Sequence, residues 1–328
     1  MNTAARTVVD GPRPAPGRAV RVLSVPLMVF AGGLLAAQSE VNGRLAAQLG
    51  TGPRTGIAAG AISIGVSLLT LLAVSSLMPG RRREVAGIAA VFRERRLRPR
   101  EASGAVLGAC FVASQGLTPM IGVALFSIAV TAGQACSALF LDHIGLSPSG
   151  RQAVSRSRVI ATALAVTAMG IGASEQLTAG VAWATVLAAA IPLATGAGLS
   201  VQQSLNGRIA RVVGPWAATV NNMVVGLATL TVAFAVSLLA AGSLNGMPGD
   251  AGLYVGGLLG TAFVALASWL ARVHGVLVLG LSVIAGQVLA AGAIQAALPH
   301  GHATPMSLIP VALTLTGVLI AFRQRAHH

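Results

Sequence analysis

Long apolar runs separated by short polar or basic segments dominate the pattern along this chain. Ten of the runs approach the roughly 20 residues that a helix needs to cross a bilayer. The pattern therefore predicts an all-α integral membrane protein with ten transmembrane helices. The expected spans are residues 22–44, 55–78, 102–118, 120–141, 156–174, 179–203, 215–241, 252–271, 275–297 and 304–322.

Composition supports this class and excludes others. Hydrophobic residues make up 55% of the chain and charged residues 9%, a balance that leaves too little polar surface for a soluble domain of 328 residues. The net charge of +14 does not indicate a nucleic-acid partner, because the basic residues lie mostly between apolar runs rather than among aromatics on one face. The two cysteines suggest neither a disulfide framework nor a metal site, and we expect no cofactor.

The arginines give an independent test of the span count. With ten spans, 20 of the 22 basic residues fall on the side of the N-terminus, and only Arg44 and Arg54 fall on the other. Such a bias predicts that both termini are cytoplasmic in a multi-pass protein of the plasma membrane. Residues 1–21 are then a disordered cytoplasmic tail, and residues 323–328 a short one. The basic stretch 81–100 is expected to anchor topology, with an interfacial helix on anionic lipid as the alternative.

One short frame occurs twice. Gln38 is followed by Asn42, Gly and Arg, and the same spacing recurs 164 positions later, half the chain length, at Gln202 and Asn206. The chain contains only six asparagines, so the recurrence indicates a duplicated gene. In a helix, a Gln and an Asn four residues apart share one face.

Further matches extend the duplication through both halves. They are Gly52-Pro53 with Gly214-Pro215, Gly104 and Gly108 with Gly256 and Gly260, and Ala132-Gly133-Gln134 with Ala285-Gly286-Gln287. Residues 22–174 and 177–322 would each hold five spans. Because five is odd, the second half would enter the membrane from the opposite side, which predicts an inverted repeat. The glycines at four-residue spacing are expected to allow close helix packing.

The duplicated Gln-x-x-x-Asn-Gly frame, together with Ala-Gly-Gln followed by Asp142-His143-x-Gly145, resembles the YdcZ-like (EamA-like) branch of the drug/metabolite transporter superfamily. The resemblance covers about residues 22–322 and implies ten spans and a secondary transporter. It does not imply a particular substrate. The second half departs from the pattern, because no Asp-His pair follows Gln287.

Polar side chains within the spans are the candidates for substrate binding. Their amides could donate to and accept from a solute in a central cavity, or could hydrogen-bond neighbouring helices. Asn221 and Asn222 stand where the first half has Ala59 and Gly60, and an unduplicated feature suits a substrate site. The amide candidates are Gln38, Asn42, Gln134, Gln202, Asn206, Asn221, Asn222 and Gln287.

Glu40 is the one carboxylate well inside an expected span, and Ser204 is its counterpart in the second half. An ionisable group there costs on the order of a few kcal/mol and is a functional candidate by default. Glu40 could exchange a proton for substrate or neutralise a cationic solute. The alternative is a structural ion pair with Arg44, which lies four residues further along the same helical face.

These observations predict a secondary-active transporter that moves a small metabolite or drug-like solute by alternating access, with proton coupling through Glu40 as an option. The alternative is a membrane-embedded enzyme or an assembly protein. Against an enzyme, the spans contain no His-Glu-x-x-His helix, no Gly-x-Ser-x-Gly turn and no carboxylate pair. The expected partners are the solute, protons and the lipid bilayer, with the protein acting as a monomer or homodimer.

Overall fold

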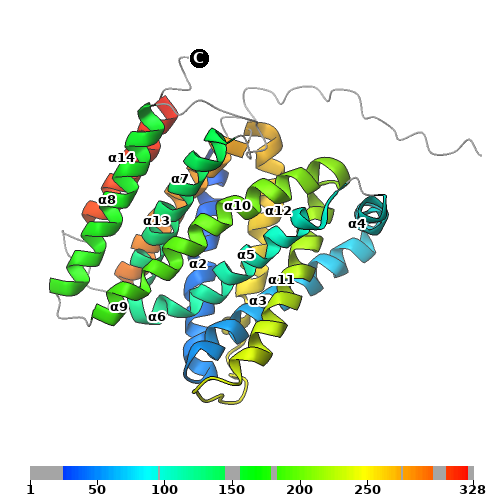
Figure 1. Ribbon diagram of the computed structural model, residues 1–328, viewed down its shortest axis with the longest axis horizontal. Coiled ribbons are helices and arrows are strands. Elements are labelled where there is room, and N and C mark those ends of the chain that lie inside the picture. The colour runs from blue at the N-terminus through cyan, green and yellow to red at the C-terminus, as the bar shows by residue number, and fades with distance from the viewer. Residues whose placement is uncertain are drawn as a thin grey trace, which may run out of the picture.

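The computed structural model describes residues 25–94, 97–144, 156–178, 183–274, 276–297 and 308–323. These residues are helical apart from short connections and one isolated antiparallel bridge between Gly50 and Leu244. The helices are α2 (Val25–Leu49), α3 (Pro53–Leu77), α4 (Pro79–Arg93), α5 (Pro99–Ser114), η1 (Gln115–Leu117), α6 (Thr118–Ile121), α7 (Val123–His143), α8 (Arg156–Thr178), α9 (Trp183–Ala188), α10 (Ala190–Val213), α11 (Pro215–Ser237), η2 (Ala251–Tyr254), α12 (Gly256–His274), α13 (Val276–Ala297) and α14 (Leu308–Arg323). Figure 1 shows α8 and α14 at one side of the bundle and α3, α4 and α11 at the other.

Helices occupy all ten ranges in which the sequence predicts spans, although several ends differ. In the described part of the chain, four helical segments are long and apolar enough to cross a membrane: Pro53–Leu77, Pro99–Ile121, Val123–Leu141 and Pro215–Ser237. Shorter apolar helical stretches lie at Val159–Ile171, Ala251–Phe263 and Ser282–Ala297. The fold class of an all-α membrane protein is therefore supported, whereas the count of ten spans stays a prediction.

The span expected at 179–203 differs most from the structure. Helix α9 ends at Ala188, and α10 begins at Ala190 and continues to Val213, ten residues beyond the expected end. The break has a local cause, because Pro192 has no N–H to donate to the carbonyl of Ala188. The long α10 carries the whole second Gln-x-x-x-Asn-Gly frame within a regular helix.

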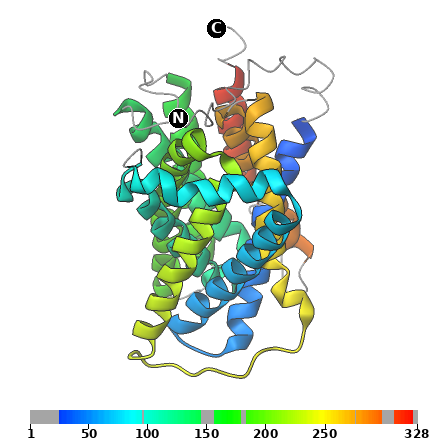
Figure 2. The same ribbon diagram turned by 90° about the vertical axis from the view of Figure 1, so that its right-hand side faces the viewer.

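Most of the basic stretch 81–100 forms a helix, as in the alternative that the sequence left open. Helix α4 crosses the long helices at one end of the bundle, as Figure 2 shows. Its buried Val91 packs with Leu97, Ile209 and Ala218, so its apolar side faces α10 and α11 rather than lipid. Arg82 is exposed on the other side, as are Arg83 and Arg93. The basic groups therefore lie on an amphipathic helix whose apolar contacts are within the protein.

The long helices pack in matched pairs across the chain. Helix α2 contacts α12 and α13, and α10 contacts α5 and α7, while α3 packs against α11 and α8 against α14. Glycines permit the closest of these approaches, although they are not the glycines at four-residue spacing that the sequence singled out. A Cβ added at Gly32 or Gly286 would overlap the α13 or α2 backbone, and one added at Gly133 or Gly196 would overlap the α10 or α7 backbone. Glycines therefore allow close backbone contact at corresponding places in the α2–α13 and α7–α10 interfaces.

Two turns join consecutive long helices in the same way. Gly52 (φ 86°) precedes Pro53 at the start of α3, and Gly214 (φ 96°) precedes Pro215 at the start of α11. Positive φ favours glycine, and proline suits the first turn of a helix because its missing N–H is not needed there. Each turn is contacted by a connection from the other half: Gly52 by Ala241 and Gly242, and Gly214 by the Glu84 side chain of α4.

Candidate functional site

The first Gln-x-x-x-Asn-Gly frame lies in a buried hydrogen-bond network. Asn42 Nδ2 donates to Gln115 Oε1 at 2.5 Å, and Gln115 Nε2 donates to Ser39 Oγ at 3.1 Å. Ser39 Oγ in turn donates to the carbonyl of Leu35, and Thr118 Oγ1 donates to the carbonyl of Ser39 at 3.3 Å. The network ties α2 to η1 and α6 where the helical segment 99–121 changes geometry.

Gln38 and Asn42 also face helix α12. A Cβ added at Gly260 would lie 3.0 Å from Gln38 Nε2, and one added at Gly256 would overlap Asn42 Oδ1. Gln38 and Asn42 are both buried, and Asn42 Oδ1 has no hydrogen-bond partner among the described residues. The absence of side chains at these two glycines is what lets the α2 amides fit against α12.

The second frame forms a different network. Gln202 Nε2 and Asn206 Nδ2 both donate to Asn222 Oδ1, at 2.7 and 3.1 Å. Asn222 therefore joins α11 to α10, and the structure brings together three of the residues that the sequence selected. The Gln202 side chain fits over Gly108 of α5, where a Cβ would overlap it. Gln202 Oε1 and Asn206 Oδ1 have no partner in the described part of the chain.

Asn221 lies beside this network without joining it. It is buried on α11, and its Nδ2 lacks a hydrogen-bond partner among the described residues. Likewise, no hydrogen bond among the described residues links the α2 amides to the α10 amides. The two frames occupy separate interfaces, α2 with α12 and α10 with α5, so the meeting of Gln38 and Gln202 in one central cavity stays a prediction.

Gln134 and Gln287 occupy corresponding positions on α7 and α13. Gln134 is buried, and its backbone carbonyl accepts a hydrogen bond of 3.0 Å from Ser200 Oγ of α10. Gln287 is 1% exposed, and neither its amide nitrogen nor its amide oxygen has a partner within the described residues. A fully buried amide without partners carries a desolvation cost of about 1–3 kcal/mol. The Gln287 amide could therefore bind a polar group other than those of the described residues.

Glu40 is half-buried on α2, one turn before the exposed Arg44. In the described part of the chain, no ion pair within 4.0 Å joins Glu40 to Arg44, in contrast to Arg81 with Glu84 and Arg100 with Glu101. Arg44 is nevertheless near enough for its charge to act on the Glu40 carboxylate, so the coupling role and the structural interaction with Arg44 both stay predictions.

Gln115 is the residue that sequence reasoning missed. It is fully buried and holds the centre of the first network, yet it lies in a stretch expected to be the end of one span. The sequence feature that could have identified Gln115 is its position as a polar amide inside an apolar run, directly before Gly116. The sequence does not predict the crossing of α2 and η1 that brings Gln115 to Asn42.

A comparison with family models finds the family described as "Putative inner membrane exporter, YdcZ", matched over residues 23–171 and 187–320. The match covers most of the chain and both halves. The chain belongs to this family. No curated protein matches it. As a YdcZ family member, the chain is a multi-pass inner-membrane protein, and its membership supports a transporter in general terms.

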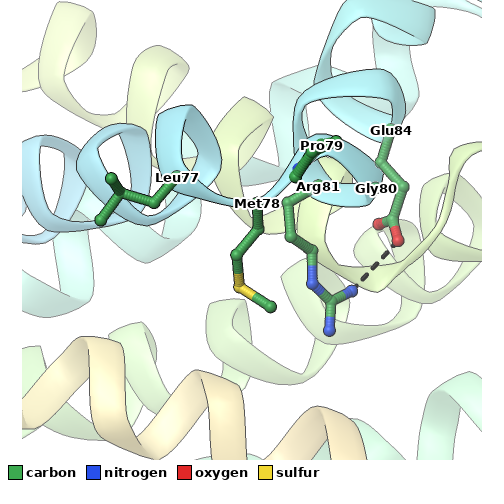
Figure 3. A pocket seen from close by; sticks show the side chains of 6 residues that line it. All are labelled: Leu77, Met78, Pro79, Gly80, Arg81 and Glu84. Atoms are coloured by element: carbon green, nitrogen blue, oxygen red, sulfur yellow. Dashed lines mark hydrogen bonds and ion pairs between the residues drawn. The ribbon is translucent and has the colours of Figure 1, made fainter.

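A surface hollow of about 460 Å³ lies at the corner between α3 and α4 of this YdcZ family member, lined by Leu77, Met78, Pro79, Gly80, Arg81 and Glu84. Figure 3 shows the guanidinium of Arg81 turned toward the carboxylate of Glu84, at 3.1 Å. The guanidinium carbon also lies 5.1 Å from the ring centroid of Trp216, whose Nε1 donates to Ser75 Oγ. None of the predicted amides lines this hollow. Its polar contacts fasten α4 to the start of α11.

Proposed function

We propose that the chain is a secondary-active transporter of a small metabolite or drug-like solute, working by alternating access between two inverted five-helix repeats, residues 22–174 and 177–322. Both termini are cytoplasmic, and ten helices span the membrane. The reciprocal packing of the two halves carries the proposal: α2 contacts α12 and α13, as α10 contacts α5 and α7. A pseudo-two-fold axis in the membrane plane relates helices in this manner.

The covered turns support the same mechanism. The turn at Gly52 is covered by the connection that follows α11, and the turn at Gly214 by the helix that follows α3. In an inverted repeat these two turns lie toward opposite sides of the membrane. If the segment over one turn moved away while the segment over the other turn stayed in place, a site between the halves would be exposed to one side of the membrane at a time. Glu40 is our candidate for coupling that cycle to protons.

The cover at Gly52 offers a direct test. Thr51 Oγ1 and Ser243 Oγ lie 3.0 Å apart, a separation from which two cysteines can form a disulfide with little backbone movement. The test variant is Thr51→Cys with Ser243→Cys, in a background with Cys110→Ala and Cys136→Ala. A thermal-shift screen of metabolites against the purified protein first selects a solute, because a ligand that binds the folded state stabilises it.

Uptake of that solute into proteoliposomes is then compared between oxidised and reduced protein. We expect oxidation to reduce transport to the level of empty liposomes and reduction to restore it. Each single cysteine variant should transport equally in both states. Full transport by the disulfide-locked protein would exclude opening at this turn, and the absence of any transported solute would count against the transporter itself.

A further inference from the structure

Two hydroxyl groups on α7 are buried without a hydrogen-bond partner. Ser127 is 0% exposed and Thr131 is 1% exposed, and neither hydroxyl oxygen is paired among the described residues. Neither residue belongs to a duplicated motif. The two lie four residues apart, so they share one face of α7, and Gln134 follows three residues later on the same face.

This lack of partners is unusual within the chain. Serine and threonine hydroxyls in helices commonly donate to the carbonyl four residues earlier. Thr261 and Thr314 do so here, each at 2.9 Å, and Ser204 does so at 3.0 Å. Ser127 and Thr131 could make the same bond and do not. Their hydroxyls are therefore available to a group outside their own helix.

Helix α7 packs against α13 as well as against α10 and α8, and Ser127 and Thr131 follow Val123 at four-residue spacing. At the start of α7, Val123 packs with Ala36 of α2 and Ala291 of α13, and Gly122 approaches the Gln295 side chain. The beginning of α7 thus lies beside the end of α13, and Figure 1 shows the two helices alongside each other. Ser127 lies one turn after Val123 along α7. Gln287 lies one turn before Ala291 along α13.

This register places Ser127, Thr131 and Gln287 at neighbouring levels of two helices that pack together. We infer that Ser127, Thr131 and Gln287 form a binding site for a small uncharged solute that carries hydroxyl or carboxamide groups. We call it the α7–α13 site. The inference rests on the proposed transport function and deepens it by assigning the class of solute.

The chemistry of the three side chains determines that class. Two hydroxyls and one carboxamide offer both donors and acceptors, and all three are uncharged. A charged solute would have to be desolvated here without a counter-charge from these groups, which is strongly unfavourable in a buried site. A polyol or an amide would satisfy the unpaired groups without that cost. The apolar contact of Ala36, Val123 and Ala291 would separate the bound solute from the adjacent end of the bundle.

The test uses variants that remove the polar group and keep the shape: Thr131→Val and Gln287→Met, with Ser127→Ala as a third. The matched control is Thr314→Val, since Thr314 is equally buried but its hydroxyl is bonded to the Pro310 carbonyl. The probes are erythritol and butyramide as uncharged solutes, with choline and butyrate as charged ones. Affinity for each probe is measured from the probe-dependent rise in unfolding temperature of the purified full chain.

We expect an uncharged probe to bind the unmodified protein and the charged probes not to bind. Thr131→Val and Gln287→Met should weaken binding by about tenfold or more while leaving the unfolding temperature without probe unchanged or raised, because an unpaired buried group has been removed. Thr314→Val should lower that temperature and keep the affinity. Unchanged affinity in the α7 and α13 variants, or binding of none of the uncharged probes, would overturn the site. Transport blocked by the Thr51–Ser243 disulfide would still support the transporter in that case.

Discussion

The hydrogen bond between Asn42 and Gln115 allows a quantitative test of the first amide network. We predict that a double-mutant cycle of Asn42→Leu and Gln115→Leu gives a coupling energy of about 1 kcal/mol. Both residues are at most 1% exposed, and the bond is 2.5 Å long. Interhelical hydrogen bonds in membrane proteins average about 0.6 kcal/mol and reach about 1.7, and a fully buried amide pair belongs in the upper part of that range.

The single variants should each cost more than the lost bond. Gln115→Leu leaves Asn42 Nδ2 buried without a partner and also removes the donor to Ser39 Oγ, so we expect a loss of about 2–3 kcal/mol. The double variant removes both partners and should be less destabilised than the sum of the singles. The free energy of unfolding is measured by titrating the protein out of mixed micelles with sodium dodecyl sulfate.

A second cycle provides the control. Gln38 is buried on the same helix but has no hydrogen bond to Gln115 among the described residues, so the cycle of Gln38→Leu with Gln115→Leu should couple by less than about 0.5 kcal/mol. Equal coupling in the two cycles, or less than about 0.3 kcal/mol between Asn42 and Gln115, would refute the network. If the network is structural alone, transport per folded molecule survives in the variants.

Three further predictions follow from the structure. Gly108→Ala should destabilise the protein by about 1–3 kcal/mol in the same unfolding assay, because its Cβ would overlap a buried glutamine amide, whereas Gly65→Ala, with open space at its Cβ, should be neutral or stabilising. Glu40→Gln should abolish proton-driven accumulation of solute in liposomes and leave solute exchange intact; accumulation with unchanged pH dependence would exclude Glu40 as the coupling group. In a cysteine-free background, Asp250→Cys should react with an impermeant maleimide on intact cells and Arg83→Cys only after permeabilisation, and the reverse pattern would overturn the topology.

The sequence was sufficient for the approximate positions of the helices, because apolar runs are long in a membrane protein. It did not identify the glycines at the closest backbone contacts, such as Gly32 and Gly133, because these are not at four-residue spacing from another glycine. The predicted ends of the helices were less accurate where a single residue determines the end. Pro192 broke the span expected at 179–203, and the helix that followed reached Val213.

The partners of the duplicated frames could not be predicted from the duplication itself. Asn42 bonds to Gln115, whereas Asn206 bonds to Asn222. The spacing that matches Gly104 with Gly256 places Ala267 opposite Gln115, and Gly60 stands opposite Asn222. Each half therefore keeps the shared amides and pairs them with a residue that the other half lacks. Which partner is used depends on helix crossings, and these follow from packing across the whole bundle rather than from local spacing.

The contacts that cover the turns at Gly52 and Gly214 differ in chemistry. The Gly52 cover is held by exposed polar contacts: Thr51 N donates to the Ser243 carbonyl at 3.0 Å, and Asn245 N to the Leu49 carbonyl at 2.8 Å. Water can replace such bonds, so each contributes only about 0.5–1.5 kcal/mol net.

The cover over Gly214 is held largely by apolar burial. Val91 and Leu97 pack against Ile209 and Ala218, and exposing a side chain of Val or Leu size costs about 1.5–3 kcal/mol. The ion pair of Arg81 with Glu84 adds little, since both side chains are about one-third exposed. In the proposed alternating-access cycle, the hydrogen bonds at Gly52 would be easier to break than the apolar packing at Gly214, although the two turns share one backbone design. We therefore propose that the connections that differ between the halves make the turn at Gly52 the easier one to open.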